Sequence, residues 1–143
     1  MRPLKIANEK AACYQFLKEN HIPVPAFFLA TNTEEFIHAA FELHHPQNSF
    51  SFKPAVANGS RGFRIVSDSI NEADHLFNQK PYNTHITYTH AVKILSSRLF
   101  PPLVVTEYLP ADEYSVDCVA NHGVALLVVP RLRQKMINDI SVQ

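Results

Sequence analysis

The stretch "FKPAVANGSRGF", residues 52–63, has the residue types of a phosphate-binding loop. It contains two of the three glycines in the chain, and Gly59 and Gly62 flank Ser60 and Arg61. Glycine lets a backbone approach a ligand closely, and successive backbone N–H groups can surround an anion. The GxxxxGK[ST] pattern of a P-loop is absent. A hairpin with an Asn-Gly turn would explain the same residues, so this stretch alone leaves both interpretations open.

Lys53 precedes this loop in a short predicted strand. Because the next residue is Pro54, Lys53 is restricted to an extended conformation. Alternation along the strand puts Phe50 and Phe52 on one face, with Ser51 and Lys53 on the other. The ammonium therefore leaves the strand on the face opposite the two phenylalanines.

A second candidate region is "TEYLPADEYSVD", residues 106–117. Glu107 ends one apolar strand and Glu113 opens the next, and ligand-binding groups often lie beside such connections. The backbone of Tyr108 and Leu109 could hydrogen-bond a base edge, and Glu113 could accept from two ribose hydroxyls. Two solvated acids beside a turn would explain the same residues.

The remaining pattern predicts an α+β chain that positions these stretches. Asn8 is the expected N-cap of the first helix, and Asn32 and Glu35 have capping-box spacing in the second. Strand 124–130 is apolar on both faces, as a central strand would be, and the tail after it shows no closing element. Helices are expected at 8–20, 32–43, 69–79 and 89–99, and strands at 49–54, 62–67, 103–109, 113–120 and 124–130. The expected apolar stripes are Ala12, Cys13, Phe16 and Leu17 in the first helix, and Phe36, Ile37, Ala40 and Phe41 in the second.

Composition excludes several classes of function. The 143 residues suggest one domain, and 13 basic and 13 acidic residues give zero formal net charge, which argues against nucleic-acid binding. No apolar run is long enough to span a bilayer. Cys13 and Cys118 form no CxxC pair, so we expect reduced core thiols in a cytoplasmic protein. The eight histidines show no metal-ligand spacing, and no metal is assigned to protein side chains.

Together with Lys10, the two stretches resemble the ATP-grasp superfamily, particularly its carbamoyl-phosphate-synthase-like and biotin-carboxylase-like branches. The motifs occur in the family's order from about Asn8 onward: "NEK" and "HIPVP", then "FKP", "ANGSRGF" and "TEYLPADEYSVD". The resemblance implies a loop-bearing N-terminal subdomain with a preceding helix at 1–106. The hinge and the first antiparallel strands of a second subdomain would follow at 107–143.

The resemblance also implies a role for each matching residue. The expected nucleotide-binding residues are Lys10 and Lys53 at the ATP phosphates, with Lys53 also near adenine; Gly59, Ser60, Arg61 and Gly62 in a mobile loop over the β- and γ-phosphates; Glu107, Tyr108 and Leu109 in the hinge; and Glu113 at the ribose. The candidates for an anionic substrate are Arg131 and Arg133.

The family reaction is ligation, in which ATP phosphorylates a carboxylate and an amine or other nucleophile attacks the acyl phosphate. Mg²⁺ is expected for a complete domain, but its usual ligands have no counterpart here. We therefore expect a truncated fold that binds ATP or ADP and is inactive alone, with an unknown carboxylate substrate. The alternatives are a non-catalytic nucleotide-binding or subunit-interaction module, and an α+β domain with an accidental resemblance. Strands left without partners predict a homodimer through the C-terminal region.

Overall fold

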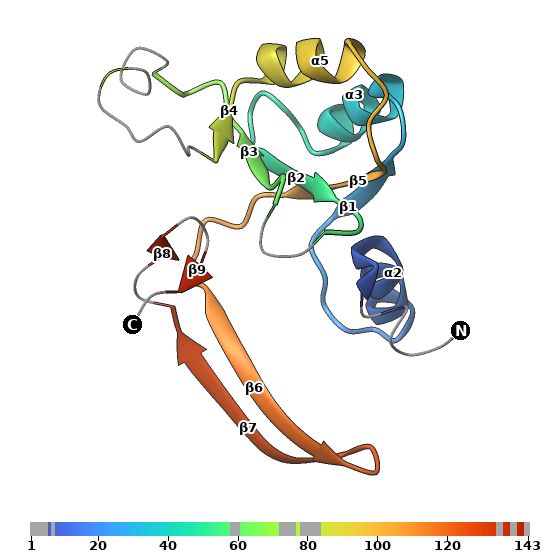
Figure 1. Cartoon of the computed structure of the whole chain (residues 1–143), viewed down its shortest axis with the longest axis vertical. Helices are drawn as coiled ribbons and strands as arrows, with labels where there is room; N and C mark the ends of the chain where they lie inside the picture. The colour runs from blue at the N-terminus through green and yellow to red at the C-terminus, as the bar shows by residue number, and fades with distance from the viewer. Residues whose placement is uncertain are drawn as a thin grey trace. The chain divides into compact units, whose positions relative to one another are not determined.

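The computed structural model describes residues 6, 8–57, 61–71, 77, 84–133, 136–137 and 140–141. The chain forms two compact units, residues 1–108 and 109–143, which are described separately below (Figure 1). Assignment of these units to the two subdomains expected from the sequence stays a prediction.

The first unit is built on a five-stranded sheet in which β5 pairs with β1 on one side and with β2 on the other. The strands are β1 (Phe27–Ala30), β2 (Phe50–Pro54), β3 (Arg64–Val66), β4 (His85–Ile86) and β5 (Leu103–Glu107), in the order β1-β5-β2-β3-β4. All neighbours are antiparallel except β3 and β4. The predicted pairing of β2 with β3 is confirmed. The sequence analysis missed β1 and β4, which are short and pair with strands distant in sequence.

The helices of this unit are α2 (Lys10–Glu19), α3 (Thr33–Glu42) and α5 (Tyr88–Ser96). The Asn32 side chain accepts from the backbone N–H of Glu35 at 2.9 Å, which confirms it as the N-cap of α3. The prediction of Asn8 as the N-cap of α2 is wrong, because Glu9 holds that position without a side-chain hydrogen bond. Most of the helix predicted at 69–79 lies outside the described residues.

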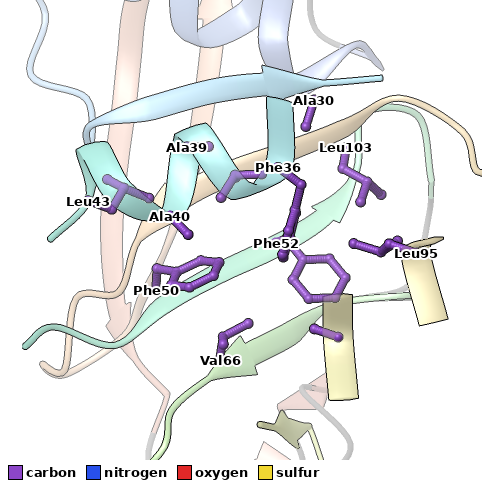
Figure 2. Packing of buried hydrophobic residues seen from close by; sticks show 12 residues of the cluster. Ala30, Phe36, Ala39, Ala40, Leu43, Phe50, Phe52, Val66, Leu95 and Leu103 are labelled. Atoms are coloured by element: carbon purple, nitrogen blue, oxygen red, sulfur yellow. The ribbon is translucent and has the colours of Figure 1, made fainter. Parts of the chain in front are cut away.

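The core lies on one face of the sheet, under α3 and α5 (Figure 2). Phe36 of α3 is fully buried, and its ring centroid lies 5.7 Å from that of Phe50 and 5.3 Å from that of Phe52. The predicted alternation in β2 is therefore correct. Ile37 and Phe41 were expected in the core, but 42% and 74% of their surfaces are exposed. The sheet contacts only the narrow stripe of α3 at i, i+3, i+4 and i+7, which comprises Phe36, Ala39, Ala40 and Leu43.

The expected apolar stripe of α2 is not part of this core. None of its residues is fully buried, and Phe16 is exposed. The helix instead contacts β1 and reaches the end of β2 through Lys10 and Tyr14.

The second unit contains the antiparallel hairpin of β6 (Tyr114–Asn121) and β7 (Val124–Leu132). Within the described residues β7 pairs with β6 alone, and all of its residues are exposed, so the prediction of a central strand is wrong. Cys118 is exposed rather than a core thiol, while Cys13 is partly buried, and both are free. In the tail, β8 (Met136–Ile137) pairs with β9 (Ile140–Ser141) in a separate two-stranded sheet.

Two substitutions in α3 test this core. We expect Phe36→Ala to lower the free energy of unfolding by about 3–5 kcal/mol, because it opens a cavity against two phenylalanine rings. Phe41→Ala, one and a half turns further along the same helix, should change it by only about 0.5 kcal/mol. Urea unfolding followed by far-UV circular dichroism measures both. Equal losses from the two variants would contradict the packing described.

Candidate nucleotide-binding site

Lys10 connects the start of α2 to the chain that follows β2. Its backbone N–H donates to the carbonyl of Ala55 at 3.1 Å. Its Nζ donates to the carbonyl of Ala57 at 2.8 Å. The first residue of α2 therefore lies beside the entrance to the glycine-containing loop, although the two are more than forty positions apart in the sequence.

Lys53 projects from the face of the sheet opposite the core. Strand pairing puts its neighbour Ser51 beside Thr106, and Thr106 beside Phe27 of β1. The Lys53 Nζ donates to the Tyr14 hydroxyl at 3.3 Å. The Tyr14 ring packs against Phe27, with 5.3 Å between ring centroids. Lys53 is thus linked to α2, the helix in which Lys10 is the first residue.

The electrostatics of this region favour an anion. Burial, and secondarily the positive charge of Lys53, lower the pKa of Lys10 below its usual value. Among the described residues, no ion pair includes either lysine. The N-terminus of α2 adds a partial positive charge at the same place. Two ammonium groups without a carboxylate partner form a site that an anion such as a phosphate would neutralise.

The loop residues are only partly described. Arg61 is exposed in a turn. Gly62 has a φ of +77°, and a Cβ there would lie 2.9 Å from both Cγ and Cδ of Pro54. Glycine is therefore required at this position both for its backbone conformation and for packing against the proline of "FKP". Gly59 and Ser60 lie outside the described residues, so their predicted contacts with phosphates stay predictions.

Glu107 makes contacts that the sequence analysis did not anticipate. Its Oε1 accepts from the backbone N–H of Ala26 at 2.8 Å, and its own N–H donates to the Ala26 carbonyl at 3.1 Å. These bonds join the end of β5 to the start of β1. The predicted strand at 103–109 therefore ends at Glu107, whose carboxylate stabilises the sheet.

Tyr108 lines a pocket of about 240 Å³ on the same face of the sheet as Lys53. Ser49 and Ile65 lie on that face because they alternate with, or pair directly to, Ser51. The sequence analysis missed this pocket, whose walls come from strand ends and turns distant in the sequence. Its other lining residues are Ser67, Ser69, Ile70, Asn71 and His85.

The candidates in the second unit pair with one another or with other residues of the hairpin. Glu113 and Arg133 form an ion pair, and the backbone N–H of Arg133 donates to the Glu113 carbonyl at 2.8 Å. Arg131 forms an ion pair with Asp117 at 2.6 Å. Leu109 is exposed. The structure therefore joins Glu113 and Arg133, which the sequence analysis had given separate roles, and adds Asp117.

The described residues include no group of three or more His, Cys, Asp or Glu side chains that could hold a metal ion. None of the helices in the described part of the chain has the length and apolar character to cross a membrane. The cytoplasmic location stays a prediction.

Comparison with known proteins identifies a family match and a fold. Residues 99–143 match the family model described as ATP-grasp in the biosynthetic pathway with Ter operon. Among solved structures, the chain is similar to an ADP complex of PurK, N5-carboxyaminoimidazole ribonucleotide synthetase, with a TM-score of 0.63 and 15% identity over 93% of this chain and 30% of that chain. It is also similar to the ATP-grasp ligase PsnB complexed with minimal precursor, with a TM-score of 0.46 and 16% identity over 96% of this chain and 43% of that chain. None of the curated proteins gave a match.

These findings confirm the resemblance to the ATP-grasp superfamily and the α+β fold. The chain spans less than half the length of both solved structures. The similarity to PurK concerns the fold, and the resemblance to the carbamoyl-phosphate-synthase-like branch stays a prediction.

Two glycine substitutions separate backbone strain from packing in the loop. We expect Gly62→Ala to destabilise the first unit by about 2–4 kcal/mol, through its positive φ and its contact with Pro54. Gly123→Ala is the control, because its φ of +79° is similar but no atom lies within 4 Å of the new Cβ; it should cost only about 1–2 kcal/mol. Amide hydrogen exchange in the strands of each unit measures both. A smaller loss at Gly62 than at Gly123 would contradict the contact with Pro54.

Proposed function

We propose that this chain, which has an ATP-grasp fold, is the nucleotide-binding part of an ADP-forming ligase in which Lys10 and Lys53 bind the phosphates. The observation that carries the proposal is that two lysines lie together at the end of β2. Lys10 is the first residue of α2, Lys53 donates to Tyr14 of the same helix, and neither lysine has a carboxylate partner among the described residues. The loop that begins after Ala57 would then lie over the same phosphates. PurK, whose fold is similar, was solved as an ADP complex.

We assign the base to the pocket that Tyr108 lines. Ser49 in that pocket and Lys53 share one face of the sheet and lie four residues apart, or about 13 Å along an extended chain. A nucleotide placed along β2 would therefore extend from a pocket at the hinge end to two ammonium groups at the loop end. Tyr108 would contribute to the base site, while the carboxylate of Glu107 stays bound to Ala26.

We assign the ligation itself to the larger enzyme of which this chain would be part. The reaction implied by the resemblance is phosphorylation of a carboxylate by ATP, followed by attack of a nucleophile on the acyl phosphate. Magnesium supplies charge neutralisation in such reactions. The described residues do not offer the cluster of carboxylates that such an ion needs. The part of this chain is to bind and orient the nucleotide.

Titration with ADP, monitored by NMR up to millimolar concentrations, tests this proposal. We expect weak binding that Lys10→Met and Lys53→Met each reduce by about ten- to a hundredfold, because each removes a hydrogen bond from a charged group to a phosphate. Lys93→Met is the matched control, since Lys93 lies in the last turn of α5, and it should bind ADP normally.

The same titration has a pH dependence. Because the pKa of Lys10 lies below its usual 10.5 in the free protein, the ammonium loses its charge at a lower pH than an ordinary lysine. ADP binding should therefore weaken as the pH rises through that lowered pKa, and bound phosphate should raise the pKa. Absence of ADP binding, or equal losses from Lys93→Met and Lys53→Met, would contradict the proposal.

We also propose that the β6–β7 hairpin pairs with a second copy of the chain. A two-stranded hairpin is only marginally stable in water, and exposed apolar side chains favour association. The large apolar residues of the hairpin that are more than half exposed are Tyr114, Val116, Val119, Val124, Leu126, Leu127 and Val128.

Light scattering tests this association. We expect a dimer whose dissociation constant increases at least tenfold when Leu126 and Val128, on one face of β7, are both replaced by lysine. Val56→Lys is the control, because Val56 is also exposed but lies in the first unit. A monomer at high protein concentration would contradict the proposal.

A further inference from the structure

Tyr14 lies one helical turn after Lys10, so both side chains project from the same side of α2. Both reach the end of β2. Lys10 contacts the carbonyls of Ala55 and Ala57, and the Tyr14 hydroxyl accepts from the ammonium of Lys53 at 3.3 Å. Neither the motifs of the sequence nor the proposed nucleotide contacts assign a role to this tyrosine.

We infer that Tyr14 is a positioning residue, whose hydroxyl holds the Lys53 ammonium beside Lys10 so that both cations face one anion. The identity of that anion as a nucleotide phosphate rests on the proposed function. The positioning of Lys53 by Tyr14 does not depend on it.

The lysine ammonium needs such an acceptor for a physical reason. A lysine side chain has several rotatable bonds and loses considerable entropy when it is fixed. Two ammonium groups close to one another also repel, which is the reason that the charge of Lys53 lowers the pKa of Lys10. Without an acceptor, Lys53 would rotate away from Lys10 into solvent.

A tyrosine hydroxyl suits this role better than a carboxylate. A carboxylate would hold Lys53 more strongly, but it would neutralise the charge that an anion must find. The neutral hydroxyl accepts a hydrogen bond and leaves the positive charge in place. The Lys53 Nζ is 5.6 Å from the Tyr14 ring centroid and 3.3 Å from its hydroxyl oxygen, so the ammonium lies toward the hydroxyl rather than over the ring.

The position of the hydroxyl is itself determined by packing. The Tyr14 ring contacts the Phe27 ring of β1 at 5.3 Å with an interplanar angle of 57°. Phe27 pairs with Thr106, which pairs with Ser51 in the strand that carries Lys53. The ring of Tyr14 is therefore anchored to the same sheet as the lysine that its hydroxyl contacts.

Tyr14→Phe tests the inference, because it removes the hydroxyl and keeps the ring on Phe27. The first readout is the pKa of Lys10, measured by NMR titration of its Cε without nucleotide. We expect Tyr14→Phe to raise this pKa, as Lys53→Met does, because the charge of Lys53 moves away from Lys10. Tyr114→Phe, at an exposed position of the hairpin, should leave it unchanged.

The second readout is ADP affinity. Tyr14→Phe should weaken binding by about two- to tenfold, the effect of one hydrogen bond, and should have no further effect in the Lys53→Met background. An unchanged Lys10 pKa in Tyr14→Phe would overturn the inference, whatever the effect of the substitution on ADP affinity. A raised pKa in a protein that binds no ADP would support the positioning role of Tyr14 and contradict the proposed nucleotide function.

Discussion

The antiparallel pairing of β5 with both β1 and β2 determines on which face of the sheet the strand residues of the site lie. Through it, Phe28 and Phe52 both pair with Val105 and face the helices, while Phe27, Thr106 and Ser51 form a row on the other face. A slip of one residue would exchange the two faces. Lys53 would then point into the core beneath Phe36, where an unpaired ammonium is unfavourable. Burial of the phenylalanines on one face thus keeps the lysine on the other.

The second constraint is electrostatic and acts through α2. The helix contributes little to the core, and its hydrogen bonds to β2 and to the chain that follows β2 come from one lysine and one tyrosine a single turn apart. Burial lowers the pKa of Lys10, and the unfavourable interaction with the charge of Lys53 lowers it further. This unfavourable interaction is the energy that an anion would relieve on binding. The same helix, placed elsewhere, would leave β2 with one isolated cation.

Part of this site was predictable from local chemistry. The restriction that Pro54 imposes on Lys53, the alternation in β2 and the N-cap at Asn32 depend only on neighbouring residues, and all agree with the structure. The requirement for glycine at position 62 is partly of this kind. Its positive φ could be expected in a turn, but the contact with Pro54 depends on how the chain folds back.

The partners of the charged groups were not predictable in the same way. Glu107 bonds to Ala26, eighty-one positions away. In the hairpin, counting back from the turn pairs Ser115 with Pro130, but a bulge between Val119 and Ala120 shifts the register so that Ser115 faces Arg131. No local pattern predicts that bulge, and it changes which residue of β7 lies opposite each residue of β6 between Tyr114 and Val119. Asp117, which forms an ion pair with Arg131, is one of the residues affected.

The periodicity of apolar residues and the restricted dihedrals of proline were thus enough to predict the α+β fold class, the order of the main elements and the face from which Lys53 projects. The convergence of Lys10, Tyr14 and Lys53, the bond that makes Glu107 stabilise the sheet, and the pocket beside Tyr108 became visible only in the folded chain. Each of these depends on contacts between strands and helices that are far apart in the chain. The residues next to each contact in the sequence do not indicate which distant residue it will meet.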